Sequence, residues 1–285
     1  MTLKHTGISL LAALFMLAMA ASSGRADETY RVNLSPPTHP GQKFQYSAVE
    51  RESTTSADLQ SADSELRFSA IATVERCSID RPIKVRLSEA SLKNVMAQEM
   101  LPPRELTVER VAITEQKPRT FKDVFAINDE PVTAPYAAAL SKVITLGGEI
   151  EPSEQQLIGP DKPLAEGDTW AISGQQAAKV FQKFHMKVDP LFVFAEGQFV
   201  ERLKFRNEFD AYKVSIGIRA ERFLPKGDEA GIPGTARARL MYYIDAHSGL
   251  ILQASYQVTT DVPTTSPNHD TRTFFREIKM REVGK

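Results

Sequence analysis

The chain has 285 residues, of which 35 are lysine or arginine and 36 are aspartate or glutamate, so its formal net charge at pH 7 is −1. A charge this close to zero excludes strong long-range attraction to nucleic acid or to anionic lipid. Cys77 is the only cysteine, which excludes an internal disulfide. We therefore expect a fold that rests on its hydrophobic core, with no nucleic-acid partner.

The first 26 residues have the features of an export signal. Lys4 and His5 precede an apolar run over residues 8–21 (ISLLAALFMLAMAA). This run matches a signal-peptide core and is too short to span a hydrocarbon layer of about 30 Å. Small residues with the spacing of a cleavage site end at Ala26. We expect cleavage there and a periplasmic or secreted protein without a membrane span, with an uncleaved N-terminal anchor as the alternative.

The first half of the chain alternates between apolar and polar residues. A polar, proline-rich segment at 27–40 is expected to be extended, and alternation then recurs near residues 44–48, 68–74 and 83–87. A period of two is typical of β-strands with one buried face. Residues 92–100 fit a strand or a helix.

The first helix is predicted near residues 133–146. Thr133 and Pro135 occupy the cap and the first turn, Tyr136 and Leu140 lie on its apolar stripe, and Gly147 follows its end. These features bound a first β-rich half at 41–146.

The segment 147–166 is rich in glycine, proline and acidic residues, and it predicts a linker. The sequence that follows, GDTWAIS at 167–173, echoes GQKFQYS at 41–47. Two related halves and two unrelated halves both remain open.

A second helix is predicted to begin at Ser173, which forms a capping box with Gln176. Its apolar stripe runs through Phe184 to Val188, and Pro190 stops it. The helix opens a second β-rich half at 167–285.

The second half carries the clearest strand pattern. Residues 212–220, 236–244 and 250–258 alternate strictly, a turn at 245–249 joins two of these runs, and a last strand is expected at about 272–283. One-sided polarity indicates antiparallel sheets with a dry and a wet face. The predicted fold class is α+β, mostly β, with long curved antiparallel sheets that each carry a covering helix. They form either duplicated halves or one continuous sheet.

Motifs for catalysis are absent from the sequence. It contains no G-x-S-x-G, P-loop, H-E-x-x-H, C-x-x-C or G-x-G-x-x-G pattern. We therefore expect no enzyme activity, no cofactor and no metal. Asp245, His247, His269 and Asp270 could hold a metal ion, but their loop positions favour local hydrogen bonding. Cys77 is either a small buried residue or a reactive thiol.

The apolar side of the C-terminal strands limits the function most. Leaving it wet would cost many kcal/mol at ~25 cal/mol per Å², and one helix covers only part of it. We therefore predict an apolar ligand surface between sheet and helix. It consists of Trp170, Phe181, Phe184, Tyr212, Val214, Ile216, Leu240, Tyr242, Ile244, Leu252 and Tyr256.

Two features of this half have two interpretations each. Trp170 either lines a pocket or plugs the end of the sheet. Basic residues alternate along 202–206 and along 237–239. They would form an anion-binding patch if these strands were neighbours, and otherwise they are a solvated face.

Two strings support a resemblance. PDKPLAEGDTW at 160–170 and IDAHSGL at 244–250 resemble a group of uncharacterised exported bacterial proteins that share a G-D-x-W step and an I-D-x-x-S/T-G-L hairpin. The likeness spans about residues 120–260 and implies no activity. A long antiparallel sheet curled round a helix also resembles the half-barrel of outer-membrane lipoprotein carriers, which is a likeness of fold alone.

These patterns predict a non-enzymatic periplasmic binding or carrier protein for an apolar or amphipathic ligand. The alternative is a structural or interaction protein of the cell envelope, whose partner is another envelope protein. A close-packed interior with an apolar patch outside it would favour the alternative.

Overall fold

The computed structural model describes residues 28–34, 38–56, 59–78, 81–95, 99–112, 121–144, 146, 152–184, 186–224, 233–263 and 269–283. The predicted signal peptide at 1–26 lies outside these residues, as do residues 147–151 of the predicted linker.

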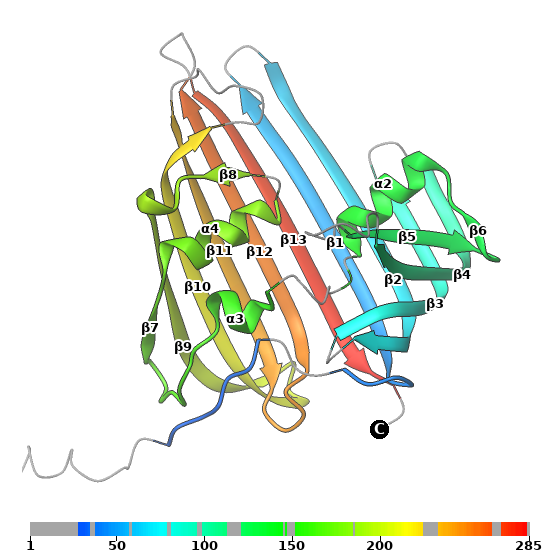
Figure 1. Cartoon of the computed structure of the whole chain (residues 1–285), viewed down its shortest axis with the longest axis horizontal. Helices are drawn as coiled ribbons and strands as arrows, with labels where there is room; N and C mark the ends of the chain where they lie inside the picture. The colour runs from blue at the N-terminus through cyan, green and yellow to red at the C-terminus, as the bar shows by residue number, and fades with distance from the viewer. Residues whose placement is uncertain are drawn as a thin grey trace, which may run out of the picture.

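Thirteen strands of the described chain make up the β structure (Figure 1). Their bounds are β1 (Lys43–Ser56), β2 (Leu59–Ser78), β3 (Arg81–Asn94), β4 (Glu99–Ala112), β5 (Phe121–Ile127), β6 (Glu130–Pro131), β7 (Thr169–Ile172), β8 (Lys187–Val188), β9 (Val193–Phe205), β10 (Phe209–Leu224), β11 (Gly234–Asp245), β12 (Ile251–Pro263) and β13 (His269–Glu282).

One antiparallel sheet joins both predicted halves. β1 pairs with β13 in an unbroken register from Phe44 opposite Glu282 to Thr55 opposite Thr271. From β1 the sheet continues through β2, β3, β4 and β5 to β6, and from β13 through β12, β11, β10 and β9 to β7, while β8 pairs with β10. The predicted fold class, mostly β with long antiparallel strands and few helices, is confirmed, and the two halves share one continuous sheet.

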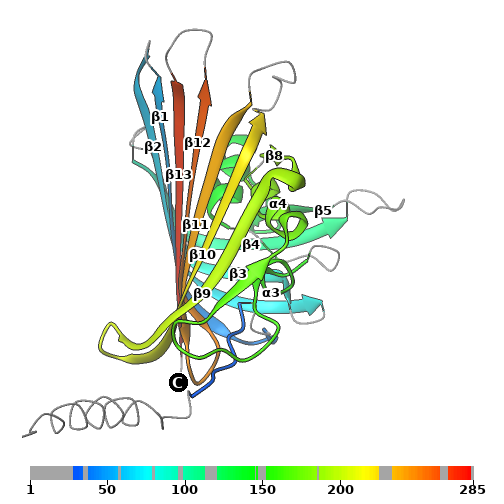
Figure 2. The same cartoon turned by 90° about the vertical axis from the view of Figure 1, so that its left-hand side faces the viewer.

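The described helices lie on one side of this sheet. They are α2 (Ala134–Val143), α3 (Glu154–Ile158), α4 (Gly174–Gln182) and the short 3-10 helix η1 (Pro190–Phe192). Figure 2 shows α3 and α4 on one side of the long strands, with β3, β4 and β5 turned toward that same side. We call this concave side the helix-side face and the other side the open face.

Helix α2 forms where it was predicted. Thr133 is its N-cap, Pro135 lies in its first turn, and Leu140 and Val143 are buried. Tyr136, which was expected on the buried stripe, is 37% exposed and points away from the core.

Helix α4 begins as predicted but ends early. The Ser173 hydroxyl accepts a hydrogen bond from the Gln176 amide, which completes the predicted capping box. The helix ends at Gln182 because the amide of Phe184 bonds to the carbonyl of Phe181, three residues back, and tightens the last turn. The prediction that helix continues to Val188 is wrong, since Val188 belongs to β8 and pairs with β10.

Two separate hydrophobic cores fill the helix-side face. The first lies between β9–β12 and the helices α3 and α4, and it includes Val32 and Leu34 of the N-terminal segment and Leu164 of the predicted linker. The second lies between β1–β5 and α2. Tyr30 and Leu164 exchange backbone hydrogen bonds of 2.8 and 3.0 Å, so the described part of segment 147–166 packs on the second half.

Candidate ligand site along strand β13

Most of the predicted ligand surface is sealed in the first core. Phe181, Val214, Ile216 and Tyr242 have no exposed surface, and Leu240 and Ile244 are 1% exposed. A side chain that lined a cavity large enough for water would keep accessible area, so these six contact packed atoms. Leu252 is 5% exposed and lies outside both core clusters.

Four predicted residues are partly buried, and the fold separates them. Tyr212 packs against Tyr30 in a tilted arrangement, with ring centroids 5.2 Å apart. The Trp170 indole N–H donates a 2.9 Å hydrogen bond to the carbonyl of Ile158, and its ring covers Gly197 at the β7 edge. Only Phe184 and Tyr256 lie beside the boundary between the two cores.

That boundary runs along β13. We use the term β13 strip for the helix-side residues Phe274, Arg276, Ile278 and Met280, all partly buried. Phe274 and Met280 pack against the first core, whereas Ile278 packs against the second. Figure 1 shows β13 passing between α4 and α2. Phe274, Ile278 and Met280 are only partly buried, so their apolar side chains keep accessible surface.

Small and aromatic neighbours shape the strip. Ala48 of β1 and Ala254 of β12 lie directly opposite Ile278. Because both side chains are small, they leave space on either side of Ile278. Phe184 packs edge-on against Phe274, with ring centroids 5.1 Å apart. The strip is therefore an apolar lane with small residues on both sides and an aromatic pair at one end.

Two tyrosines on the strands beside the lane donate hydrogen bonds to helices. The Tyr46 hydroxyl donates a 2.6 Å hydrogen bond to the carbonyl of Val143, the last residue of α2. The Tyr256 hydroxyl donates to the Glu154 carboxylate of α3 at 3.0 Å. Burial raises the pKa of both tyrosines above the usual value, so both hydroxyls stay protonated and act as donors.

A buried ion pair interrupts the apolar lane. Glu50 is 4% exposed, and its Oε2 accepts hydrogen bonds from Nη2 and Nε of Arg276 at 2.8 and 3.1 Å. Lys142 of α2 adds a second cation 3.9 Å from Glu50 Oε1. Burial raises the pKa of the Glu50 carboxyl despite the attraction of Arg276. The lane thus offers charge beside apolar surface, the combination that an amphipathic molecule requires.

A second group of polar side chains, around Glu154 at the start of α3, lies next to the lane. Glu154 also pairs with Lys183 at 3.4 Å, and Tyr256 packs edge-on against Tyr242 at 5.9 Å. The Tyr242 hydroxyl is fully buried without a hydrogen-bond partner within the described chain. Burial, and then the charge of Glu154, raises its pKa well above the usual value, which keeps it protonated.

The predicted surface therefore missed the residues of the β13 strip. Phe274, Arg276, Ile278 and Met280 alternate with Phe275, Glu277 and Lys279 in the last strand. That alternation was recognised as a strand, but the mixed polarity of both faces hid its position between two cores. Glu50 gave no signal, because its partner Arg276 is 226 positions away.

The structure bears on two of the alternative interpretations. Asp245 Oδ1 accepts hydrogen bonds from the amides of His247 and Ser248, so it organises the turn, and the described residues contain no cluster of three metal-ligating side chains. The basic runs on β9 and β11 do not meet, since β10 lies between them. No helix in the described parts of the chain is long and apolar enough to cross a membrane.

Comparisons with known proteins leave the family open. No family model matches the chain, and no curated protein matches it. Among the similar solved structures is lipovitellin, from a study of its lipid–protein interactions, with 8% identity and a TM-score of 0.38 over 85% of this chain. The chain spans 25% of the length of that lipovitellin chain.

Two further structures are similar over most of their length. An outer membrane channel from Pseudomonas putida F1 is 11% identical, with a TM-score of 0.20 over 87% of this chain and 98% of that one. A LolA superfamily protein from Nitrosomonas europaea is 9% identical, with a TM-score of 0.16 over 87% of this chain and 90% of that one. All of these TM-scores are too low to indicate a common fold.

Proposed function

We propose that this chain is an exported envelope protein that binds an amphipathic molecule non-covalently along the β13 strip. The predicted export signal in residues 1–26 is the reason for this location. One observation carries the binding proposal: Phe274, Ile278 and Met280 keep accessible apolar surface between two closed cores. Apolar side chains that keep accessible surface beside full cores are typical of contact with a ligand or partner.

The chemistry of the lane selects the class of ligand. An acyl chain would lie over Ile278 and Met280, because the small side chains of Ala48 and Ala254 leave space beside Ile278. Arg276 and Lys142 supply donors for a polar or anionic headgroup beside it. The function is binding without chemical conversion of the ligand, and it requires no cofactor.

Uptake of a fluorescent fatty acid tests the proposal, with residues 1–26 removed because their apolar run would bind lipid by itself. Ile278→Glu places a charge on the lane and should weaken binding at least about tenfold, as expected from the loss of about two buried methylene contacts. Ser47→Glu places the same charge on the open face, beside Lys279, and should bind as the unaltered protein does.

A folding check separates loss of binding from loss of structure. Ile278→Trp keeps the lane apolar but fills it, and it should also weaken uptake while circular dichroism stays unchanged. Failure of the unaltered protein to take up any fatty acid would overturn the proposed function. Equal binding by the unaltered protein and both Ile278 variants would place the site elsewhere.

The envelope-interaction alternative also has an observation in its favour. The six sealed residues of the predicted surface show a packed core under α4, while Leu191 and Phe194 are 84% and 59% exposed outside it. If fatty-acid uptake is absent, capture of envelope proteins on the immobilised chain, with Leu191→Ser as the control, becomes the test of that function.

A further inference from the structure

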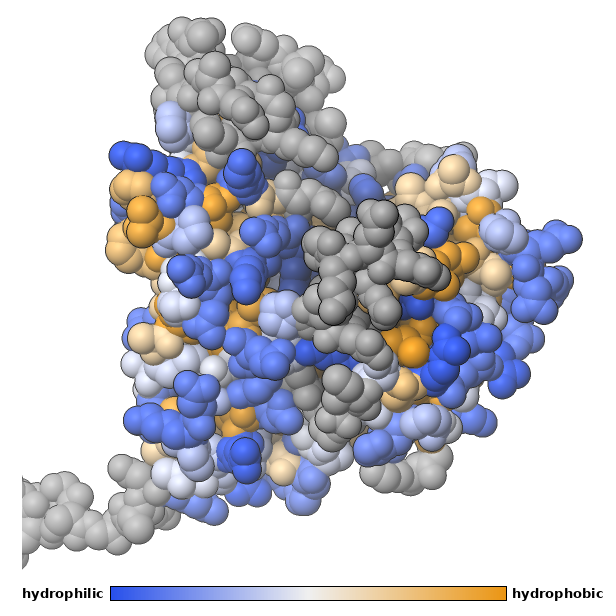
Figure 3. All heavy atoms as spheres, in the orientation of Figure 1, coloured by the Kyte–Doolittle hydropathy of each residue, from blue (hydrophilic) through white to orange (hydrophobic). Residues whose placement is uncertain are grey.

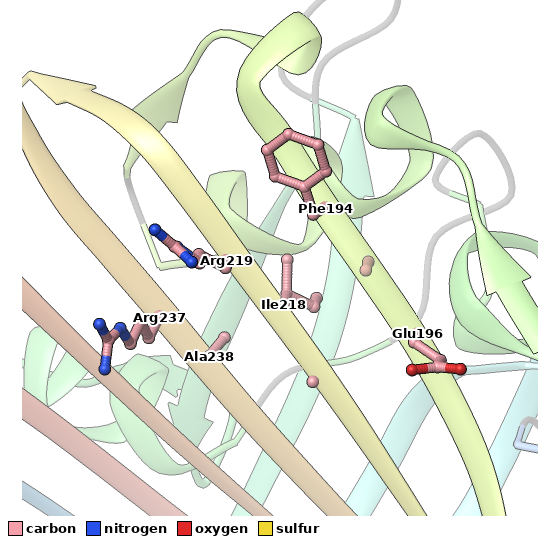
Figure 4. A pocket seen from close by; sticks show the side chains of 8 residues that line it. Phe194, Glu196, Ile218, Arg219, Arg237 and Ala238 are labelled. Carbon is pink, nitrogen blue, oxygen red and sulfur yellow. The ribbon is translucent and has the colours of Figure 1, made fainter. Parts of the chain in front are cut away.

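The open face carries a shallow depression where β9, β10 and β11 run side by side. It is open to solvent with a volume of about 420 Å³, and its lining includes Phe194, Glu196, Gly217, Arg219 and Arg237 (Figure 4). Gly217 creates the space, because a Cβ at this position would have no atom within 4 Å. The depression lies on the opposite side of the sheet from the β13 strip.

Two arginines line this depression, and a third lies beside it in the sheet. Arg219 and Arg237 are directly opposite in the register of β10 and β11, and Arg239 is opposite Gly217. Figure 4 shows Arg219 and Arg237 extending side by side from neighbouring strands. Arg219 pairs with Glu221 at 3.1 Å, but within the described chain Arg237 and Arg239 have no carboxylate within 4.0 Å. Like charges directly opposite on a sheet are destabilising, so this arrangement favours an anionic partner.

Exposed apolar side chains adjoin the arginines. Phe194 is on the rim of the depression, and Leu191 precedes it in η1. Phe192 lies between Leu191 and Phe194 in sequence. The guanidinium carbon of Arg222 is 3.8 Å from the centre of the Phe192 ring. Figure 3 shows apolar side chains gathered at the upper left edge of the molecule, over the segment between β8 and β9. Exposed apolar side chains with arginines near them match the interfacial region of a lipid layer.

We propose that this surface docks on a lipid bilayer that displays anionic headgroups. Arg237 and Arg239 would contact lipid phosphates, and Leu191 and Phe194 would enter the interface. The near-zero charge of the whole chain gives no long-range steering, so contact depends on these residues within a Debye length of ~10 Å. A bilayer fits better than a folded acidic partner, because two exposed apolar side chains, Leu191 and Phe194, are too few to form a flat interface of standard size.

Co-sedimentation with vesicles tests this surface, again with residues 1–26 removed. The protein should bind vesicles of phosphatidylglycerol and phosphatidylcholine but not vesicles of phosphatidylcholine alone, and added salt should weaken the binding. Replacing both Arg237 and Arg239 by Gln should weaken binding about tenfold or more, from the loss of two basic residues near the lipid surface. Replacing Leu191 and Phe194 by Ser should also weaken it while the charge is unchanged.

A matched control carries the same change in charge elsewhere on the open face. Arg51 and Arg67 pair with Glu65 and are more than half exposed, so replacing both by Gln should leave vesicle binding unchanged. The proposal would be overturned if both double variants lost vesicle binding equally, or if the unaltered protein bound neither kind of vesicle. Binding of dextran sulfate without binding of vesicles would also overturn it and assign the patch to a soluble polyanion. The outcome is independent of fatty-acid uptake at the β13 strip.

Discussion

Gly197 of β9 has no room for a side chain, because an aromatic ring packs directly against it. A Cβ there would lie 2.1 Å from Cζ2 of Trp170, the only tryptophan. Gly197→Ala should therefore displace the indole, cost about 1–3 kcal/mol in the free energy of unfolding and shift tryptophan emission to the red. Gly217→Ala, which enters open space, should change neither. Unchanged emission and stability in Gly197→Ala would contradict this packing.

Glu50 links stability to pH. Burial raises the pKa of its carboxyl above the ordinary value of 4.5, so the folded protein holds this proton more tightly than the unfolded chain. Stability from this group is full below pH 4.5 and is lost as pH rises through the folded pKa. Relative to Glu50→Gln, the unaltered protein should lose stability as pH rises from 4.5. Urea unfolding of both at several pH values measures the difference, and a flat or opposite trend would contradict it.

At the scale of elements, a serine that caps a helix should contribute more to stability than a serine on a helix surface. Ser173 caps α4, which carries Val180 and Phe181 into the core. Ser173→Ala should cost about 1 kcal/mol by chemical denaturation. Ser141 lies exposed within α2 and bonds only to the carbonyl of Ala138, so Ser141→Ala should stay within about 0.5 kcal/mol. Equal effects of the two changes would show that the cap contributes nothing.

Alternation predicted the strands well because each long strand buries one face. The same logic failed for the end of α4. Phe184 and Val188 follow helical spacing, yet Val188 is buried through the pairing of β8 with β10, a contact that spacing does not reveal. The composition of segment 152–166 predicted a linker without a helix. The segment contains α3, whose capping box joins Ser153 and Gln156 and whose Leu157 is buried. Strong loop composition outweighed a short helical signal.

At the scale of the whole molecule, the candidate site could not be predicted from local pattern. The lane exists because β1 and β13, the two ends of the described strand order in sequence, pair in the middle of the sheet. The strands with the clearest alternation, β10 and β11, are the best covered. The sequence pattern therefore located the core rather than the partly buried β13 strip.

The continuous sheet also predicts how the molecule unfolds. Cys77 lies in the first predicted half and Trp170 in the second, and each is the only residue of its type. Because β1 and β13 join the halves, thiol reactivity and tryptophan emission should change at the same urea concentration. Two separate midpoints would show that 41–146 and 167–285 unfold as independent domains.

The central claim is that the β13 strip holds an amphipathic molecule, and native mass spectrometry tests it most directly. The protein would be purified without detergent from the periplasm of cells that produce the full chain. We predict a discrete added mass that organic solvent releases and that Ile278→Glu abolishes. A bare protein mass, together with no uptake of a fluorescent fatty acid, would contradict the account.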